Sequence, residues 1–142
     1  MFRKGFTLIE IMLVVIIIGV LAAMVVPSIA GRGEQARKTA ARTDIEANLA
    51  NALDLYQIDN SHYPATEQGL MALVGQPSSS PIPEKWNGPY LKKKKLPKDP
   101  WGHSYVYACP GEQNKEGYDL SSFGPDGVES KDDITNWDKD EK

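Results

Sequence analysis

The chain has 142 residues, which is enough for one small domain beside a hydrophobic segment. Its formal charge of −3 gives no reason to expect binding to nucleic acid. The single cysteine, Cys109, excludes an intrachain disulfide, although an exported domain of this size often needs a stabilising cross-link. A metal ion or an assembly remains as an alternative means of stabilisation.

The first 26 residues combine a basic start with a long apolar run. Arg3 and Lys4 precede an uninterrupted apolar stretch at 11–26. A cleaved signal peptide has a shorter apolar region of about 7–15 residues. A membrane anchor with its basic end in the cytoplasm accounts for the length and the charges. Neither alternative explains Glu10, because a carboxylate at bilayer depth costs about 2.5–3.5 kcal/mol.

One long helix is predicted from residue 6 to about residue 57. Its apolar half ends at Pro27, where the missing backbone donor predicts a kink or a local break. After residue 34, apolar residues recur at spacings of three and four, which predicts one buried helix face. The apolar positions of this face are Ala41, Ile45, Leu49, Ala52, Leu53 and Tyr56.

The helix is expected to stop at 58–61, and a segment rich in proline, glycine and serine follows. A short helix is predicted at 66–74, where the sequence Thr-Glu-Gln at 66–68 gives a weak N-terminal cap signal. The lysine run at 92–95 is either a solvated face or a contact for anionic lipid or for an acidic patch on another subunit.

Two strands are predicted in the second half of the chain. Residues 103–108 alternate with period two, and residues 118–123 form the second candidate. Two or three short antiparallel strands packed on the amphipathic half-helix predict a small α+β head. Six aromatic residues are assigned to the head's core: Trp86, Tyr90, Trp101, Tyr105, Tyr107 and Trp137.

A polar loop at 124–134 follows the last predicted strand and carries carboxylates at both ends. Calcium takes about six to eight oxygen ligands from carboxylates and backbone carbonyls. A loop that brings Asp126 and Asp133 face to face would supply two charged ligands, with carbonyls for the rest. The acidic spacing is not that of an EF-hand, and a solvated acidic turn is the simpler alternative.

The sequence Gly-Phe-Thr-Leu-Ile-Glu at 5–10, preceded by Lys4, resembles the processing site of type IV prepilins and type II secretion pseudopilins. The resemblance implies that a prepilin peptidase cuts after Gly5 and that the new N-terminal residue, Phe6, is N-methylated. Glu10 would then pair with the Phe6 ammonium of a neighbouring subunit. Such a pair in low dielectric would penalise any other stagger of the helices.

The rest of the chain is similar to the family of major, G-type pseudopilins of type II secretion. The similar segments are 66–70, 88–91, 99–102, 105–107, 110–111 and 122–137. The resemblance implies one structural calcium ion, bound by the side chains of Asp126 and Asp133, with Asp132 as an alternative ligand. The carbonyls that would add to this set are those of Phe123, Val128 and Ser130.

The resemblance also implies an organisation and a function. Residues 1–5 would be the leader, 6–28 the transmembrane and polymerisation helix, and 29–142 a periplasmic, pilin-like head. The mature chain would cross the bacterial inner membrane once. It would form a homopolymer that works with minor pseudopilins and an inner-membrane assembly platform to export folded proteins.

The alternative is a type IV pilin that serves adhesion, motility or DNA uptake. The lack of a C-terminal cysteine pair and the segments at 99–102 and 126–137 favour the pseudopilin. No nucleophile–base pair, zinc-ligand cluster or phosphate loop is recognisable in the sequence, so an enzyme is not expected.

Overall fold

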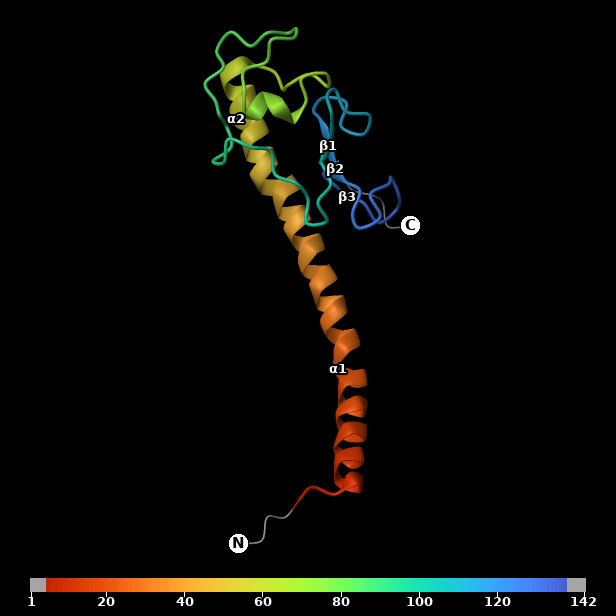
Figure 1. Ribbon diagram of the computed structural model, residues 1–142. Helices are drawn as coiled ribbons and strands as arrows, with labels where there is room; N and C mark the ends of the chain where they lie inside the picture. Colours follow the sequence, from red (N-terminus) through yellow and green to blue (C-terminus); the bar gives the residue numbers. More distant parts are fainter. Residues whose placement is uncertain (1–4, 138–142) are drawn as a thin grey trace. The chain divides into compact units, whose positions relative to one another are not determined.

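The computed structural model describes residues 5–137, apart from the side chains of residues 26–30 (Figure 1). The chain divides into two compact units, Met1–Ala36 and Arg37–Lys142. We call the described parts of these units the N-terminal unit and the head. The N-terminal unit holds the first part of helix α1, Leu8–Thr43, and the head holds the remaining helical segments and all described strands.

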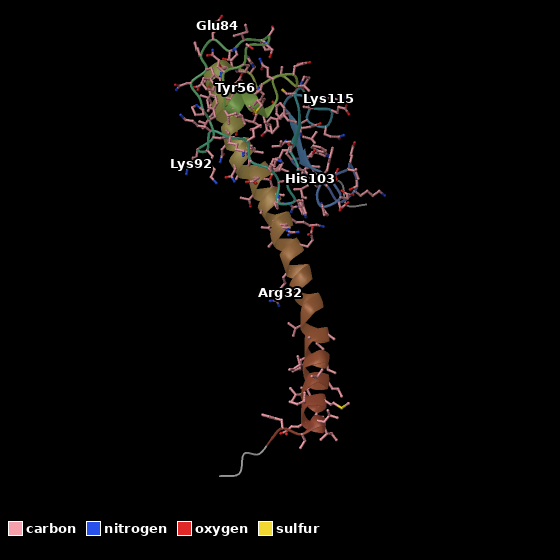
Figure 2. All side chains as sticks on the ribbon, in the orientation of Figure 1. Arg32, Tyr56, Glu84, Lys92, His103 and Lys115 are labelled. Atoms are coloured by element: carbon pink, nitrogen blue, oxygen red, sulfur yellow. The ribbon has the colours of Figure 1, made fainter. Side chains whose placement is uncertain are left out.

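In the N-terminal unit, α1 presents its apolar side chains to the surroundings on every side (Figure 2). The segment Leu8–Val25 has a mean hydropathy of 3.0, and none of it is buried. It is long and apolar enough to cross a membrane. The backbone of α1 continues through Pro27, so the predicted local break is wrong. The fixed φ of proline is itself compatible with a helix, and only one backbone hydrogen bond is lost.

The helical part of the head continues from α1 through a π-helical segment, η1 (Asp44–Leu49), into α2 (Ala50–Asn60). Steps of four residues drift around an α-helix of about 3.6 residues per turn, and a wider π turn offsets part of that drift. The predicted buried face is confirmed, because all six of its apolar positions are buried. The helix ends one residue before Ser61, whose φ of 66° closes the last turn.

The segment after the helix contains less helix than predicted. Only η2, Leu70–Leu73, is helical, as a 3₁₀ turn that follows a turn at 66–69. The cap also differs: the backbone N–H of Ala65 donates to Gln68 Oε1 at 3.0 Å. The hydroxyl of Thr66 instead bonds the backbone of Cys109, donating to its carbonyl and accepting from its N–H. A tertiary contact therefore replaces the predicted cap.

Three antiparallel strands form the sheet, in the order β1 (Val106–Ala108), β2 (Asp119–Ser122) and β3 (Ile134–Thr135). The two predicted strands are confirmed at shorter length, and the α+β head is confirmed with them. The sequence did not predict β3, whose two residues pair with Ser121 and Ser122. All four residues of β2, the central strand, are buried.

The core of the head lies between the buried helix face, η2 and the sheet, with Leu73, Leu120 and Ile134 among its buried members. Tyr105 is buried in this core, and four of the other predicted aromatic residues pack against it: Trp86, Tyr90, Trp101 and Tyr107. Trp137 instead lines an open pocket with Tyr118 and Ile45. The lysine side chains at 92–95 are all exposed, and Lys92 extends from the surface of the head (Figure 2).

Candidate assembly motif and candidate metal loop

The start of α1 is closed by a reciprocal pair of hydrogen bonds between Thr7 and Glu10. The N–H of Glu10 donates to Thr7 Oγ1 at 3.3 Å, and the N–H of Thr7 donates to Glu10 Oε2 at 3.4 Å. This is a capping box, in which two backbone donors without helical partners are satisfied by side chains. A carboxylate in the first helical turn also interacts favourably with the helix dipole.

The capping box gives Glu10 a partner within its own chain. The partner of Glu10 that the sequence predicts lies instead in a neighbouring subunit. Threonine followed three residues later by glutamate, at the start of an apolar run, is the signal that indicates this cap.

The predicted processing site lies immediately before the helix. Gly5 and Phe6 are in non-helical backbone, and Phe6 is 80% exposed. The predicted cleavage point thus lies in a non-helical, exposed segment, where a peptidase can approach the backbone without unwinding a helix. Arg3 and Lys4, the predicted basic flank, lie outside the described residues.

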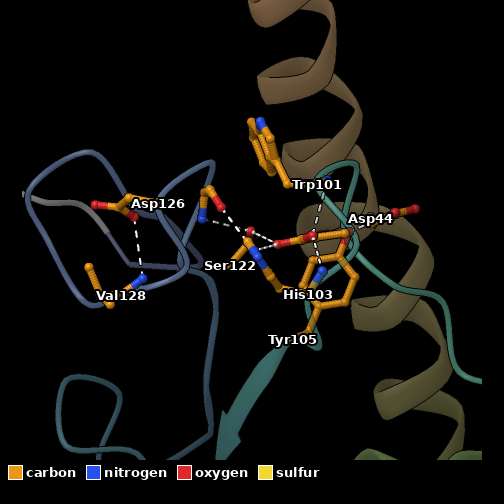
Figure 3. A network of polar contacts seen from close by, with 9 residues as sticks. Asp44, Trp101, His103, Tyr105, Ser122, Asp126 and Val128 are labelled. Carbon is orange, nitrogen blue, oxygen red and sulfur yellow. Dashed lines mark hydrogen bonds and ion pairs between the residues drawn. The ribbon is translucent and has the colours of Figure 1, made fainter.

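The first half of the predicted metal loop curves through two glycines. Gly124 and Gly127 both have φ of 69°, a conformation that residues with a Cβ rarely adopt. Asp126 is exposed between them, and its Oδ1 accepts from the N–H of Val128 at 3.3 Å (Figure 3). The side chain of Phe123, whose carbonyl is a predicted ligand, is half-buried.

The second half of the loop gathers Ser130, Asp132 and Asp133. The N–H of Ser130 donates to both carboxylate oxygens of Asp133 at 3.1 Å. The hydroxyl of Ser130 donates to Asp132 and to Asp133. Asp133 is half-buried and Asp132 is exposed. The structure therefore brings the carboxylates of Asp132 and Asp133 together at Ser130. The carboxylate of Asp126 lies apart from this group in the hydrogen-bond pattern and bonds the N–H of Val128.

These donors suit a hard cation such as calcium, because carboxylates and carbonyls are hard oxygen ligands. Within residues 5–137, no three His, Cys, Asp or Glu side chains gather as a metal site. Backbone carbonyls are among the oxygen ligands that could accompany two carboxylates around a cation. The curved backbone at Gly124 and Gly127 is compatible with such a set, since carbonyls converge only where a loop curls.

A buried carboxylate beside the loop was not recognised in the sequence. Asp99 is only 4% exposed. Its Oδ1 accepts from the N–H groups of Trp101 at 3.1 Å and His103 at 2.8 Å, and its Oδ2 accepts from Ser122 Oγ at 2.6 Å (Figure 3). The sequence Asp-Pro-Trp-Gly at 99–102 indicates a turn with aspartate as its side-chain acceptor, but not the contact with Ser122.

A second polar contact fastens the helix to the sheet side of the head. Tyr105 Oη donates to Asp44 Oδ2 at 2.8 Å. Burial raises the pKa of Tyr105, and the hydrogen bond and charge of Asp44 raise it further. The phenol therefore stays protonated and keeps donating to Asp44 throughout the physiological pH range.

An N-terminal apolar helix that begins at a capped motif, together with a small α+β head, defines a pilin-like subunit. A family model of the prokaryotic N-terminal methylation motif matches residues 1–26. A second family model, described as type II secretion system (T2SS), protein G, matches residues 28–137.

Relatives match along nearly the whole chain. The type II secretion system core protein G of Pseudomonas aeruginosa is 52% identical over 141 residues, with 96% of each chain covered. The protein of the same name from Escherichia coli K12 is 53% identical over 137 residues, covering 95% of this chain and 91% of that protein.

A solved structure is also similar. The crystal structure of the major pseudopilin from the type 2 secretion system of enterohaemorrhagic Escherichia coli has a TM-score of 0.67 and 41% identity. The similarity covers 75% of this chain and 87% of that one. The chain belongs to the type II secretion system protein G family, which confirms the predicted resemblance. It is a structural pseudopilin subunit and not an enzyme.

Proposed function

We propose that the chain is the major subunit of a type II secretion pseudopilus and polymerises through its N-terminal helix into a periplasmic fibre. The exposed apolar surface of Leu8–Val25 supports this proposal most directly. Apolar surface of this extent is stable only in lipid or against other copies of the helix. The same segment therefore serves as an anchor before assembly and as an interface after it.

Processing prepares the polymerisation interface. In this proposal a prepilin peptidase cuts between Gly5 and Phe6, and Phe6 is N-methylated. The new ammonium of Phe6 then lies a few residues from the Glu10 carboxylate. In a bundle of helices, Glu10 pairs with the ammonium of a neighbour, and its bond to Thr7 holds the carboxylate until that partner arrives. An unpaired charge in low dielectric is costly, so the pair selects one register.

Calcium stabilises the head in the same proposal. Asp126 and Asp133 supply charged oxygens from the two halves of the loop, with Asp132 as the alternative and the carbonyls of Phe123, Val128 and Ser130 completing the set. The cation would join two segments that are each held locally in the structure. Neutralising several carboxylates on one loop also removes their mutual repulsion.

Membership of the family supports a proposed location and a proposed set of partners. The unassembled chain is proposed to cross the inner membrane once, with its head in the periplasm. An inner-membrane platform adds subunits to the fibre, and minor pseudopilins join it. The growing fibre then helps folded proteins to leave through the outer membrane.

The test is complementation in the bacterium that encodes the chain, with the gene deleted. The wild-type chain is expected to restore export of type II substrates, and Glu10→Ala is expected to abolish both export and fibre formation. Glu116→Ala is the matched control, because Glu116 is an exposed glutamate of the head. Normal export in the deletion strain, or normal fibres from Glu10→Ala, would contradict the proposal.

A further inference from the structure

Two parts of the head that are distant in sequence meet at the predicted metal loop. The turn at 99–103 lies against the start of the loop at 122–127 (Figure 3). We call these segments the seat and the first arm. We propose that Asp99 and His103 in the seat are positioning residues, which hold the first arm in its curved conformation before a cation binds. The inference rests on the proposed calcium site.

The Asp99 carboxylate connects the seat to the end of β2. It is buried and accepts the two backbone N–H groups of its own turn, which fixes its orientation. Its second oxygen accepts from Ser122 Oγ at 2.6 Å, and the same Oγ accepts from the N–H of Gly124 at 3.2 Å. The chain of contacts thus runs from a buried charge to the first residue of the turn in the loop, and each polar group in it has a partner.

The imidazole of His103 contacts the first arm at Gly124 and Gly127, the two glycines with positive φ. His103 Nδ1 lies 3.1 Å from the carbonyl oxygen of Gly124. A Cβ placed on Gly127 would lie 3.0 Å from His103 Cε1, so the ring packs directly against the backbone of Gly127. These two glycines produce the curvature on either side of Asp126. The ring therefore supports the backbone on both sides of the predicted ligand.

A loop that already has its binding conformation binds a cation more tightly than a loop that must first be ordered. A loop that must be ordered on binding spends part of the binding free energy on lost conformational entropy. Residues that orient metal ligands from behind typically change affinity by about 10–100-fold when removed. Neither Asp99 nor His103 is proposed as a ligand, so their effect would act through the loop conformation.

His103 is the better position for the test, because its side chain is 42% exposed and its removal leaves the core intact. We expect His103→Ala in the full chain, purified in detergent, to weaken calcium binding about tenfold by titration calorimetry. His103→Asn keeps a side-chain N–H near the position of Nδ1 and should restore most of the affinity. His62→Ala is the control, because His62 bonds Tyr63 and is outside both segments.

Amide hydrogen exchange without calcium gives an independent result. We expect the amides of residues 124 and 126–128 to exchange faster in His103→Ala than in the wild type, and faster still in Asp99→Asn. An unchanged dissociation constant with a uniformly lower Tm would overturn the inference, because the role would then be structural only. If the wild type binds no calcium, the metal part of the proposed function fails. Unchanged amide exchange at residues 124 and 126–128 in the variants would separately refute the proposal that the seat holds the first arm.

Discussion

The N-terminal unit and the head differ in whether their apolar side chains are exposed or buried. The head buries them on one helix face and covers that face with η2 and the sheet. The N-terminal unit leaves them exposed on all sides along Leu8–Val25. The head therefore contains the interactions that fold it, whereas the N-terminal unit depends on lipid or on other subunits. The difference separates folding from assembly within one chain.

The largest expected effect comes from the same substitution made in each unit. Leu49→Ala removes a fully buried side chain of the head and should lower the free energy of unfolding by about 2–5 kcal/mol. Leu13→Ala removes a side chain of the N-terminal unit that is already exposed, and it should leave head stability unchanged. Denaturant unfolding followed by tryptophan fluorescence compares them. Equal destabilisation by the two substitutions would refute the division of roles.

Calcium removal should have the next largest effect and should act on the head. At free calcium about 100 times the dissociation constant, binding to the folded state adds about 2.7 kcal/mol. A chelator should therefore lower the Tm, and Asp126→Asn or Asp133→Asn should abolish the response. Glu129→Gln, an exposed loop residue that is not a proposed ligand, should keep it. If neither calcium nor chelator changes the Tm of the wild type, the proposed calcium site is excluded.

Loss of the helix cap should have a smaller effect, confined to the N-terminal unit. Thr7→Ala removes a capping-box partner of Glu10 and should cost about 0.5–2 kcal/mol in the first turn of α1. Amide exchange at residues 10 and 11 in detergent micelles would report this fraying, and Thr7→Ser should restore the cap. If the alanine variant exchanges at the wild-type rate, the capping box is not formed in solution.

Alkaline pH should destabilise the head without an effect near neutrality. Burial, followed by Asp54 and Tyr63, raises the pKa of Tyr118 to about 12, against about 10 in an unfolded chain. The folded state then keeps a proton that the unfolded state loses, so stability falls as pH rises from about 10 to 12. Stability against pH should have a shallower slope in Tyr118→Phe. An identical slope in both proteins would show that Tyr118 does not contribute.

Local periodicity made the helices of the head predictable. Spacings of three and four predicted the whole buried face, and alternation predicted strand β1. The π-helical segment η1 and strand β3 were not predictable in this way, because one depends on packing and the other has only two residues.

The candidate sites were predictable only in part. The polar loop itself suggested Asp126 and Asp133, and the family resemblance added the remaining ligand candidates. The cap at Thr7 had a readable signal that was missed. The contact between Asp99 and Ser122 spans 23 residues of sequence, and nothing in the local pattern of either segment indicates it. Contacts of this kind are set by the tertiary fold and not by propensity.

The separation of folding from assembly is tested most directly by comparing the full chain with a chain that begins at Arg37. Analytical ultracentrifugation and electron microscopy would follow assembly, and thermal unfolding would follow the fold. The shortened chain is expected to be monomeric and to unfold cooperatively, while the processed full chain is expected to form fibres. A shortened chain that forms fibres, or one that does not fold, would contradict this separation.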